Sequence, residues 1–167
     1  MPQTNTETPV WGEELKYFMN IGESDSPSYE EVTHLLSWED DGDEQAYEPD
    51  YLDKKLPSRF VIGRTATISY EKDTFRNNNL DDFFTTHENE ANIPVEILRI
   101  YSWIEDESST PQAPVYKAKK APFLLSTNML SKSAGSEPVK ATGSLSMADD
   151  GDWEDGTWNG TAFASGE

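Results

Sequence analysis

Alternation of apolar and polar residues predicts several β-strands. The clearest is residues 59–71, RFVIGRTATISYE, where β-branched and aromatic residues dominate. One face of that strand should carry its apolar side chains: Phe60, Ile62, Ala66, Ile68 and Tyr70. Residues 93–104, IPVEILRIYSWI, are apolar on both sides, as in a strand that is buried or faces a partner. Residues 113–125 and 139–147 predict two further strands, the first with prolines near its ends.

One helix is predicted near the middle of the chain, in LDDFFTTHENE. Asn79 should cap it, and Asp81 and Asp82 fall in its first turn, where carboxylates favour the positive end of the helix dipole. Its apolar face has the spacing of a helix: Leu80, Phe83 and Phe84.

Two segments near the N-terminus allow more than one structure. Residues 11–19 permit a short amphipathic turn or a strand, and we favour the strand. Ser28 and Glu31 have the spacing of a capping box, which could start a helical turn through His34 to Trp38. A strand over the same residues is the alternative.

Residues 39–58, EDDGDEQAYEPDYLDKKLPS, predict an acidic excursion from the core. Eight carboxylates precede the first lysine, and Gly42 and two prolines interrupt the segment. Tyr47, Tyr51 and Leu52 are apolar groups with no evident use on an exposed loop of a monomer. They indicate that the loop docks on another surface, such as a neighbouring copy.

Composition is consistent with one folded domain that has polar ends. The chain has 167 residues, of which 35% are hydrophobic and 11% aromatic, so a β-rich core is expected despite a mean hydropathy of −0.74. We expect a mobile arm at 1–10, a single domain at 11–163 and a short tail at 164–167.

The net charge argues against a protein that grips DNA. Thirteen basic and 32 acidic side chains give a net charge of −19, which repels phosphates and anionic membranes. Such a surface suits DNA that must pass without sticking. There is no cysteine, which rules out thiolate chemistry and cysteine zinc sites, and neither an export signal nor a membrane span is predicted.

Carboxylates gather near the C-terminus, in ADDGDWEDG, and invite a calcium interpretation. They are Asp149, Asp150, Asp152, Glu154 and Asp155. The EF-hand pattern fails when it is started at Asp150, because position 6 is Asp155 rather than Gly and position 12 is Thr161 rather than Glu. We therefore interpret the cluster as a solvated turn and predict no metal and no cofactor.

No catalytic residue is predicted. His34 and His87 lack the spacing of a helical metal site and have no nucleophile beside them, and no pair of carboxylates is marked for glycoside hydrolysis. No phosphate-binding loop or nucleophile elbow occurs.

Two other groups are candidates for contacts between subunits. Lys117, Lys119 and Lys120 form the densest positive group, and an acidic loop of a neighbouring subunit is a better partner for them than nucleic acid. Trp153 and Trp158 flank Gly156 and should pack on their own hairpin or on a neighbour.

The order of these features resembles the major tail proteins, or tail tube proteins, of bacteriophages with long non-contractile tails. The resemblance covers about residues 11–163, and four segments carry it: EPDYLDKKLPSRFVIGRTATISYEKDTF, NNNLDDFF, EILRIYSW and KATGSLSMADDGDWEDGTWNG. It implies a β-sandwich or half-barrel with one flanking helix, in which the last segment forms a terminal hairpin.

The resemblance also implies a function. Subunits of this family form hexameric rings that stack into a tube around a lumen for the genome, with termini and the long loop bridging successive rings. The implied partners are other copies, the tape measure, terminator and distal tail proteins, and DNA as passing cargo. The implied location is the virion tail, after assembly in the host bacterial cytoplasm.

Three alternatives stay open at this stage. A tail terminator or neck component would keep the phage setting but would be present in few copies. An acidic β-sandwich that binds carbohydrate or calcium would use the five tryptophans as sugar platforms. A hydrolase with an acidic site would depend on one or two particular carboxylates.

Overall fold

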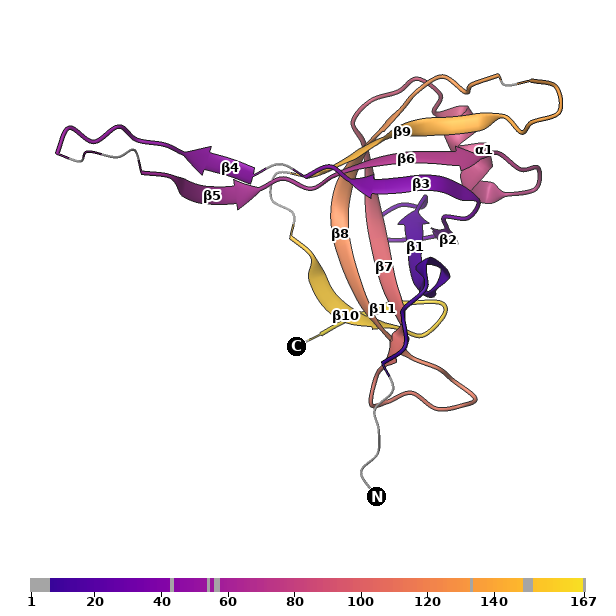
Figure 1. Ribbon diagram of the computed structural model, residues 1–167. Coiled ribbons are helices and arrows are strands. Elements are labelled where there is room, and N and C mark those ends of the chain that lie inside the picture. Colours follow the sequence, from indigo (N-terminus) through magenta and orange to yellow (C-terminus); the bar gives the residue numbers. More distant parts are fainter. Residues whose placement is uncertain are drawn as a thin grey trace.

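The computed structural model of the chain describes residues 7–42, 44–53, 55, 58–132, 134–148 and 152–166. It is mainly β with a single α-helix in that part of the chain, as the sequence predicts (Figure 1). The elements in chain order are η1 (Gly12–Glu14), β1 (Leu15–Asn20), β2 (Tyr29–Glu31), β3 (Leu35–Asp40), β4 (Glu44–Tyr47), β5 (Phe60–Arg64), β6 (Thr67–Asp73), α1 (Asn79–Thr86), β7 (Ile93–Glu105), β8 (Tyr116–Thr127), β9 (Lys140–Met147), β10 (Glu154–Trp158) and β11 (Phe163–Ser165).

The main sheet curls into a half-barrel, one of the two architectures that the sequence predicts. Its strand order is β2-β1-β7-β8-β9-β6-β3, and all neighbours are antiparallel. Figure 1 shows β3, β6 and β9 crossing over β1, β7 and β8. The rings of Tyr17 on β1 and Trp38 on β3 come within 4.6 Å, so distant parts of the sheet meet in space.

Strand β8 divides its outer edge between two partners. Its second half, from Phe123, pairs with β9, and its first half, up to Lys120, pairs with β10. β10 also pairs with β11. The hairpin that the resemblance implies over 140–160 is therefore wrong, because β9 and β10 pair with β8 one after the other and not with each other. Residues 149–151, the predicted turn, lie outside the described residues.

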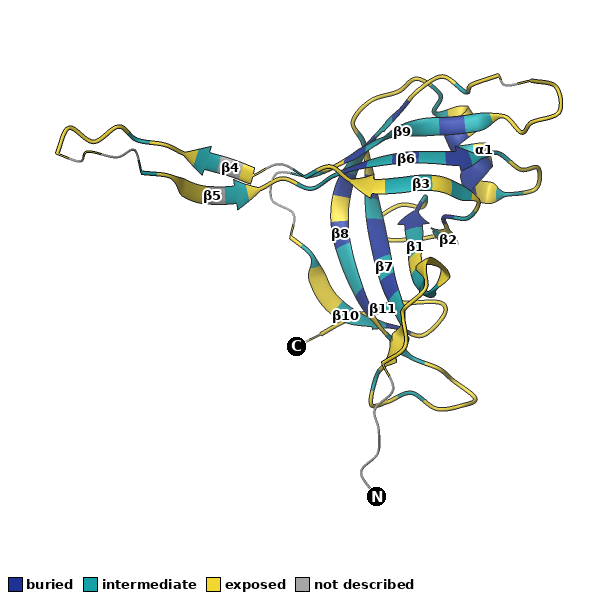
Figure 2. Ribbon diagram, viewed as in Figure 1, coloured by how far each residue is buried: buried dark blue, intermediate teal, exposed yellow. Residues whose placement is uncertain are grey.

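The core lies between the crossing halves of the sheet and beneath α1. The buried side chains that form it come from both halves and from the helix: Met19, Val32, Ile68, Tyr70, Leu80, Phe84, Val95, Ile97, Ala121, Phe123, Leu125 and Leu145. A smaller cluster on the other face of β7 and β8 contains Leu98, Ile100, Ala118 and Trp158. Figure 2 shows buried residues along β7 and β8, where both faces of the sheet are partly covered.

Helix α1 is held to the barrel by a buried ion pair. Lys72, on the core face of β6, contacts the carboxylate of Asp81, and both side chains are almost completely inaccessible. The other oxygen of Asp81 accepts a hydrogen bond from the Phe75 N–H at 2.9 Å. The cap is Asn78 rather than the predicted Asn79, and its side chain accepts from the N–H groups of Leu80 and Asp81.

Residues 29–31 and 35–38 lie in strands and no helical turn forms between them, so the predicted helical turn is wrong and the strand alternative is correct. β2 pairs with β1, and β3 pairs with β6. His34 between them has φ 57°, in the left-handed region, which a right-handed helix cannot include. Cross-strand pairing thus overrides the local capping-box pattern.

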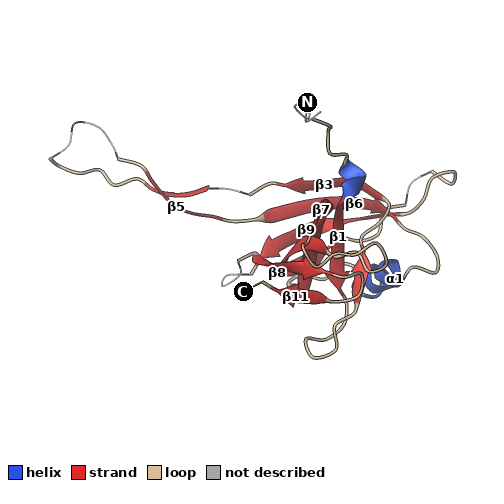
Figure 3. Ribbon diagram, turned by 90° about the horizontal axis from the view of Figure 1, so that it is seen from below, coloured by secondary structure: helices blue, strands red, loops and turns tan. Residues whose placement is uncertain are grey.

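The predicted strand at 59–71 is two strands. β5 pairs with β4 in a separate two-stranded sheet, and β6 enters the main sheet. The acidic excursion is therefore a hairpin that extends to Arg64, and it projects far from the barrel in both views (Figures 1 and 3). Phe60 is exposed, whereas Ile68 and Tyr70 are buried, because the break at residues 65–66 separates the two halves of the expected apolar face.

We predict that Asp81→Ala lowers the free energy of unfolding by about 3–5 kcal/mol, because it leaves the Lys72 ammonium buried without a counter-charge. Asp82→Ala is the matched control, since Asp82 lies in the same helical turn but is exposed; its cost should stay below about 1 kcal/mol. Urea unfolding measures both, and equal losses would contradict the role given to the buried pair.

Candidate assembly surfaces

The projecting hairpin carries exposed apolar side chains on both of its faces. Tyr47 and Phe60 are cross-strand partners, so their side chains share one face, and Val61 lies opposite Ala46. The exposed large apolar residues of the hairpin are Tyr47, Tyr51, Leu52, Phe60 and Val61. The sequence indicated the first three but placed Phe60 on the apolar face of one continuous strand. A two-stranded hairpin is marginally stable alone, so this one is expected to pack on a partner.

The hairpin is less acidic than the segment 39–58 suggests. Four carboxylates and four cations lie between residues 44 and 64. Arg59 pairs with Glu48 at 3.0 Å and with Glu44 at 3.7 Å, which neutralises the sides of the hairpin. The remaining acidity is concentrated at its base, in residues 39–41.

Two of the three clustered lysines have partners within their own chain. Lys119 lies 3.3 Å from Asp155, and Lys120 lies 3.6 Å from both Glu96 and Glu154. Lys117 is exposed and makes no ion pair within the described part of the chain. Of the three, Lys117 is thus the one best placed to meet a carboxylate of another copy.

Trp158 and Trp153 pack within the chain. Trp158 is buried in the smaller cluster, and its ring lies 5.2 Å from that of Phe18 and 5.6 Å from that of Tyr29. Trp153 is half-buried against Phe123, with ring centroids 5.6 Å apart. Both rings thus pack on other strands of their own chain, rather than on the predicted hairpin, and a contact with a neighbouring copy stays a prediction.

Arg99 is an unusual cation that the sequence pattern did not single out. It lies opposite Tyr17 and Lys119 in the register of β1, β7 and β8, so the three side chains share the concave face. Its guanidinium lies 5.7 Å from the ring of Tyr17 and 5.5 Å from that of Tyr101. Burial raises the pKa of the Tyr17 phenol, and the Arg99 charge opposes that shift.

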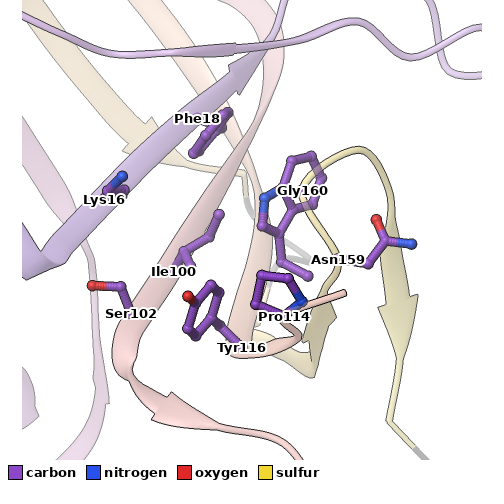
Figure 4. Close-up of a pocket in the computed structure, with 9 residues that line it drawn as sticks. Lys16, Phe18, Ile100, Ser102, Pro114, Tyr116, Asn159 and Gly160 are labelled. Carbon is purple, nitrogen blue, oxygen red and sulfur yellow. The ribbon is translucent and has the colours of Figure 1, made fainter. Parts of the chain in front are cut away.

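An apolar pocket of about 410 Å³ lies over the smaller cluster (Figure 4). Figure 4 shows Phe18, Ile100 and Tyr116 around it, with Lys16 and Ser102 as its polar groups on that side. Its lining has no carboxylate, histidine or paired nucleophile and base. The pocket offers contact area and no evident acid–base chemistry.

A larger groove of about 820 Å³ lies on the outward face of β7 and β8, beside loop 21–28. Pro94 is opposite Leu124, and Glu96 is opposite Pro122, so these four side chains line one strip of the sheet. Glu23 and Asp25 of the loop form the acidic rim.

The buried amide of Asn20 positions this loop. Its oxygen accepts hydrogen bonds from the N–H groups of Gly22 at 2.9 Å and Ser28 at 2.8 Å, and its nitrogen donates to Glu96 at 3.1 Å. A Cβ at Gly22 would approach the Ser26 carbonyl oxygen to 2.4 Å, so the tight turn requires glycine. The groove is therefore a built feature of the fold.

The remaining candidate groups have local partners. His87 lies 2.8 Å from Glu90, and His34 stacks on Phe75 at 3.9 Å. Among the described residues, no three histidine or acidic side chains are placed to hold a metal ion. Asp149 and Asp150 of the predicted acidic turn lie outside them. No helix in the described ranges has the length and apolar character that a membrane span requires.

Comparison with solved structures shows a shared fold. A chain from the tail of an empty gene transfer agent particle, obtained by helical refinement with C6 symmetry, has a TM-score of 0.55 at 16% identity, over 87% of this chain and 98% of that one. A chain of the native gene transfer agent virion has a TM-score of 0.53, with the same identity and coverage. The chain has the fold of these two particle proteins. A chain in the anti-feeding prophage baseplate has a TM-score of 0.48 at 9% identity. No protein-family model matches the sequence, and no curated protein matches it.

Trp158→Ala should lower the free energy of unfolding by about 3–5 kcal/mol, because it opens a cavity between Phe18 and Tyr29. Trp11→Ala removes an exposed indole and should change the free energy of unfolding by no more than about 0.5 kcal/mol. Denaturant unfolding followed by circular dichroism compares the two variants. A small loss for Trp158→Ala would show that its burial contributes little to the monomer.

Proposed function

We propose that this protein is a structural subunit of a phage-type tail tube, assembled as stacked hexameric rings around a lumen for the genome. The observation that carries the proposal is the fold. It overlaps 98% of a chain from a helical, six-fold symmetric tail, with a TM-score above 0.5. The interpretation from sequence leads to the same class by an independent route.

The surface of the monomer supports assembly. A hairpin with exposed apolar residues projects into solvent, which is costly unless another molecule covers it. Tyr47, Tyr51, Leu52 and Lys117 have the exposure that an interface between copies needs. Lys119, Lys120, Trp153 and Trp158 have partners in their own chain, and Tyr51 also has an interaction of its own. Several weak contacts per copy would add up in a tube.

The charge supports the passage of DNA. A net charge of −19 opposes the phosphate contacts that create non-specific binding. The proposed role is structural and not enzymatic, with DNA as passing cargo and with tape measure, terminator and distal tail proteins as further partners. The protein would act in the virion tail after assembly in the host cytoplasm.

Concentrated purified protein should form hexameric rings or tubes in negative-stain electron micrographs, with the tail partners added if it does not assemble alone. Sedimentation of the same samples gives the fraction assembled. A species that stays monomeric with those partners present would contradict the proposal, and single rings that never grow would indicate a terminator or neck component instead.

Limited proteolysis should report the same assembly. The arm at 1–10 and the segment 39–58 should be cleaved quickly in the monomer and become protected on polymerisation, because both are expected to lie at contacts between copies. Mass spectrometry of the fragments locates the cuts. Unchanged cleavage at 39–58 in assembled tubes would remove the hairpin from the interface.

A further inference from the structure

The groove beside loop 21–28 is open to solvent in the single chain. We propose that it receives the end of the β4–β5 hairpin of a second copy, with Leu52 on the apolar strip and Lys55 at the acidic rim. This contact rests on the proposed function, since it requires self-assembly, and it adds the surface that the hairpin meets.

The first argument is apolar complementarity. Leu52 is fully exposed at the end of the hairpin, where it covers nothing in its own chain. The strip formed by Pro94, Pro122 and Leu124 is the apolar floor of a groove of about 820 Å³, which is large enough for several side chains. Placing Leu52 there removes apolar surface of both partners from water.

The second argument is the sign of the charges. Glu23 and Asp25 stand on the rim, and neither makes an ion pair within the described residues. Lys55 is exposed and likewise makes no ion pair in the part of the chain that the structure describes. The acidic rim of the groove and the cation beside Leu52 are therefore complementary in charge.

The third argument is geometry. The hairpin projects away from β1, β7 and β8, whose outer face carries the groove, in both the front view and the view from below (Figures 1 and 3). Its end therefore cannot fill the groove of its own chain. A contact between the tip of one copy and the groove of the next is heterologous, so it propagates from copy to copy.

A charge swap tests the contact. Asp25→Lys and Lys55→Glu should each weaken assembly by about tenfold or more, because each places like charges together. The double variant should recover to within about threefold of the original protein, since it restores the pair with its signs exchanged. Sedimentation and electron microscopy measure assembly, and circular dichroism confirms that each variant is folded. Glu107→Lys and Lys132→Glu are matched controls, because both residues are exposed and outside the groove and the hairpin.

Crosslinking tests the contact without relying on tubes. The chain has no cysteine, so Leu52→Cys and Ser24→Cys proteins each carry a single thiol. An equimolar mixture treated with a short bismaleimide should yield a heterodimer. Leu52→Cys mixed with Ser108→Cys should not, since Ser108 is exposed in the distant β7–β8 loop.

The outcomes separate the two proposals. Tubes that form normally with Asp25→Lys and Lys55→Glu, and no Leu52–Ser24 crosslink, would overturn the groove and leave the tube function standing. A specific crosslink with rings or tubes absent would support the groove and contradict the tube. If assembly is weakened in both single variants and is not recovered in the double variant, the direct pairing of Asp25 with Lys55 would be overturned.

Discussion

Hydrogen bonding along β8 is the constraint on which the rest of the fold depends. One edge of this strand is paired with β7 for most of its length, while the other edge serves β9 and then β10. Pro122 lies in the interval between those two partners, where a strand can tolerate the loss of an N–H donor. The divided edge lets one half of the sheet turn over the other and enclose the core.

Helix α1 covers the open side of the core between the two crossing halves of the sheet and holds it in place. Lys72 extends toward the helix from the core face of β6 and forms an ion pair with Asp81 in the first helical turn. Such a buried pair adds little net stability by comparison with apolar packing. It specifies one position for the helix, because any other position would leave a buried charge without its partner. The same strand β6 is preceded by the hairpin, so the ion pair also anchors the base from which the hairpin projects.

The monomer thus has a half-barrel, a projecting hairpin and a groove that Asn20 and the loop after it shape. In the barrel, Trp158 is buried and Trp153 is half-buried, while Lys119 and Lys120 have partners in their own chain, so little of the predicted interface lies on the body itself. Five of the thirteen exposed large apolar side chains of the described chain lie on the hairpin, and the groove with an acidic rim lies on the opposite part of the fold. Because the hairpin end and the groove lie on different parts of the subunit, a contact between them can be repeated from copy to copy.

The sequence by itself determined the mainly β class, the single helix and the positions of β6, β7, β8 and β9, because alternation and helical spacing are local signals. It also indicated the excursion and its exposed Tyr47 and Leu52. Only the tertiary structure decided that β10 pairs with β8, that the strand at 59–71 breaks in two, and that Lys72 is buried. Strand partners are chosen by side chains and backbone groups far apart in the chain, and no local pattern records that choice. The groove has the same origin, since Asn20, Glu96 and Pro122 meet only after three strands have paired.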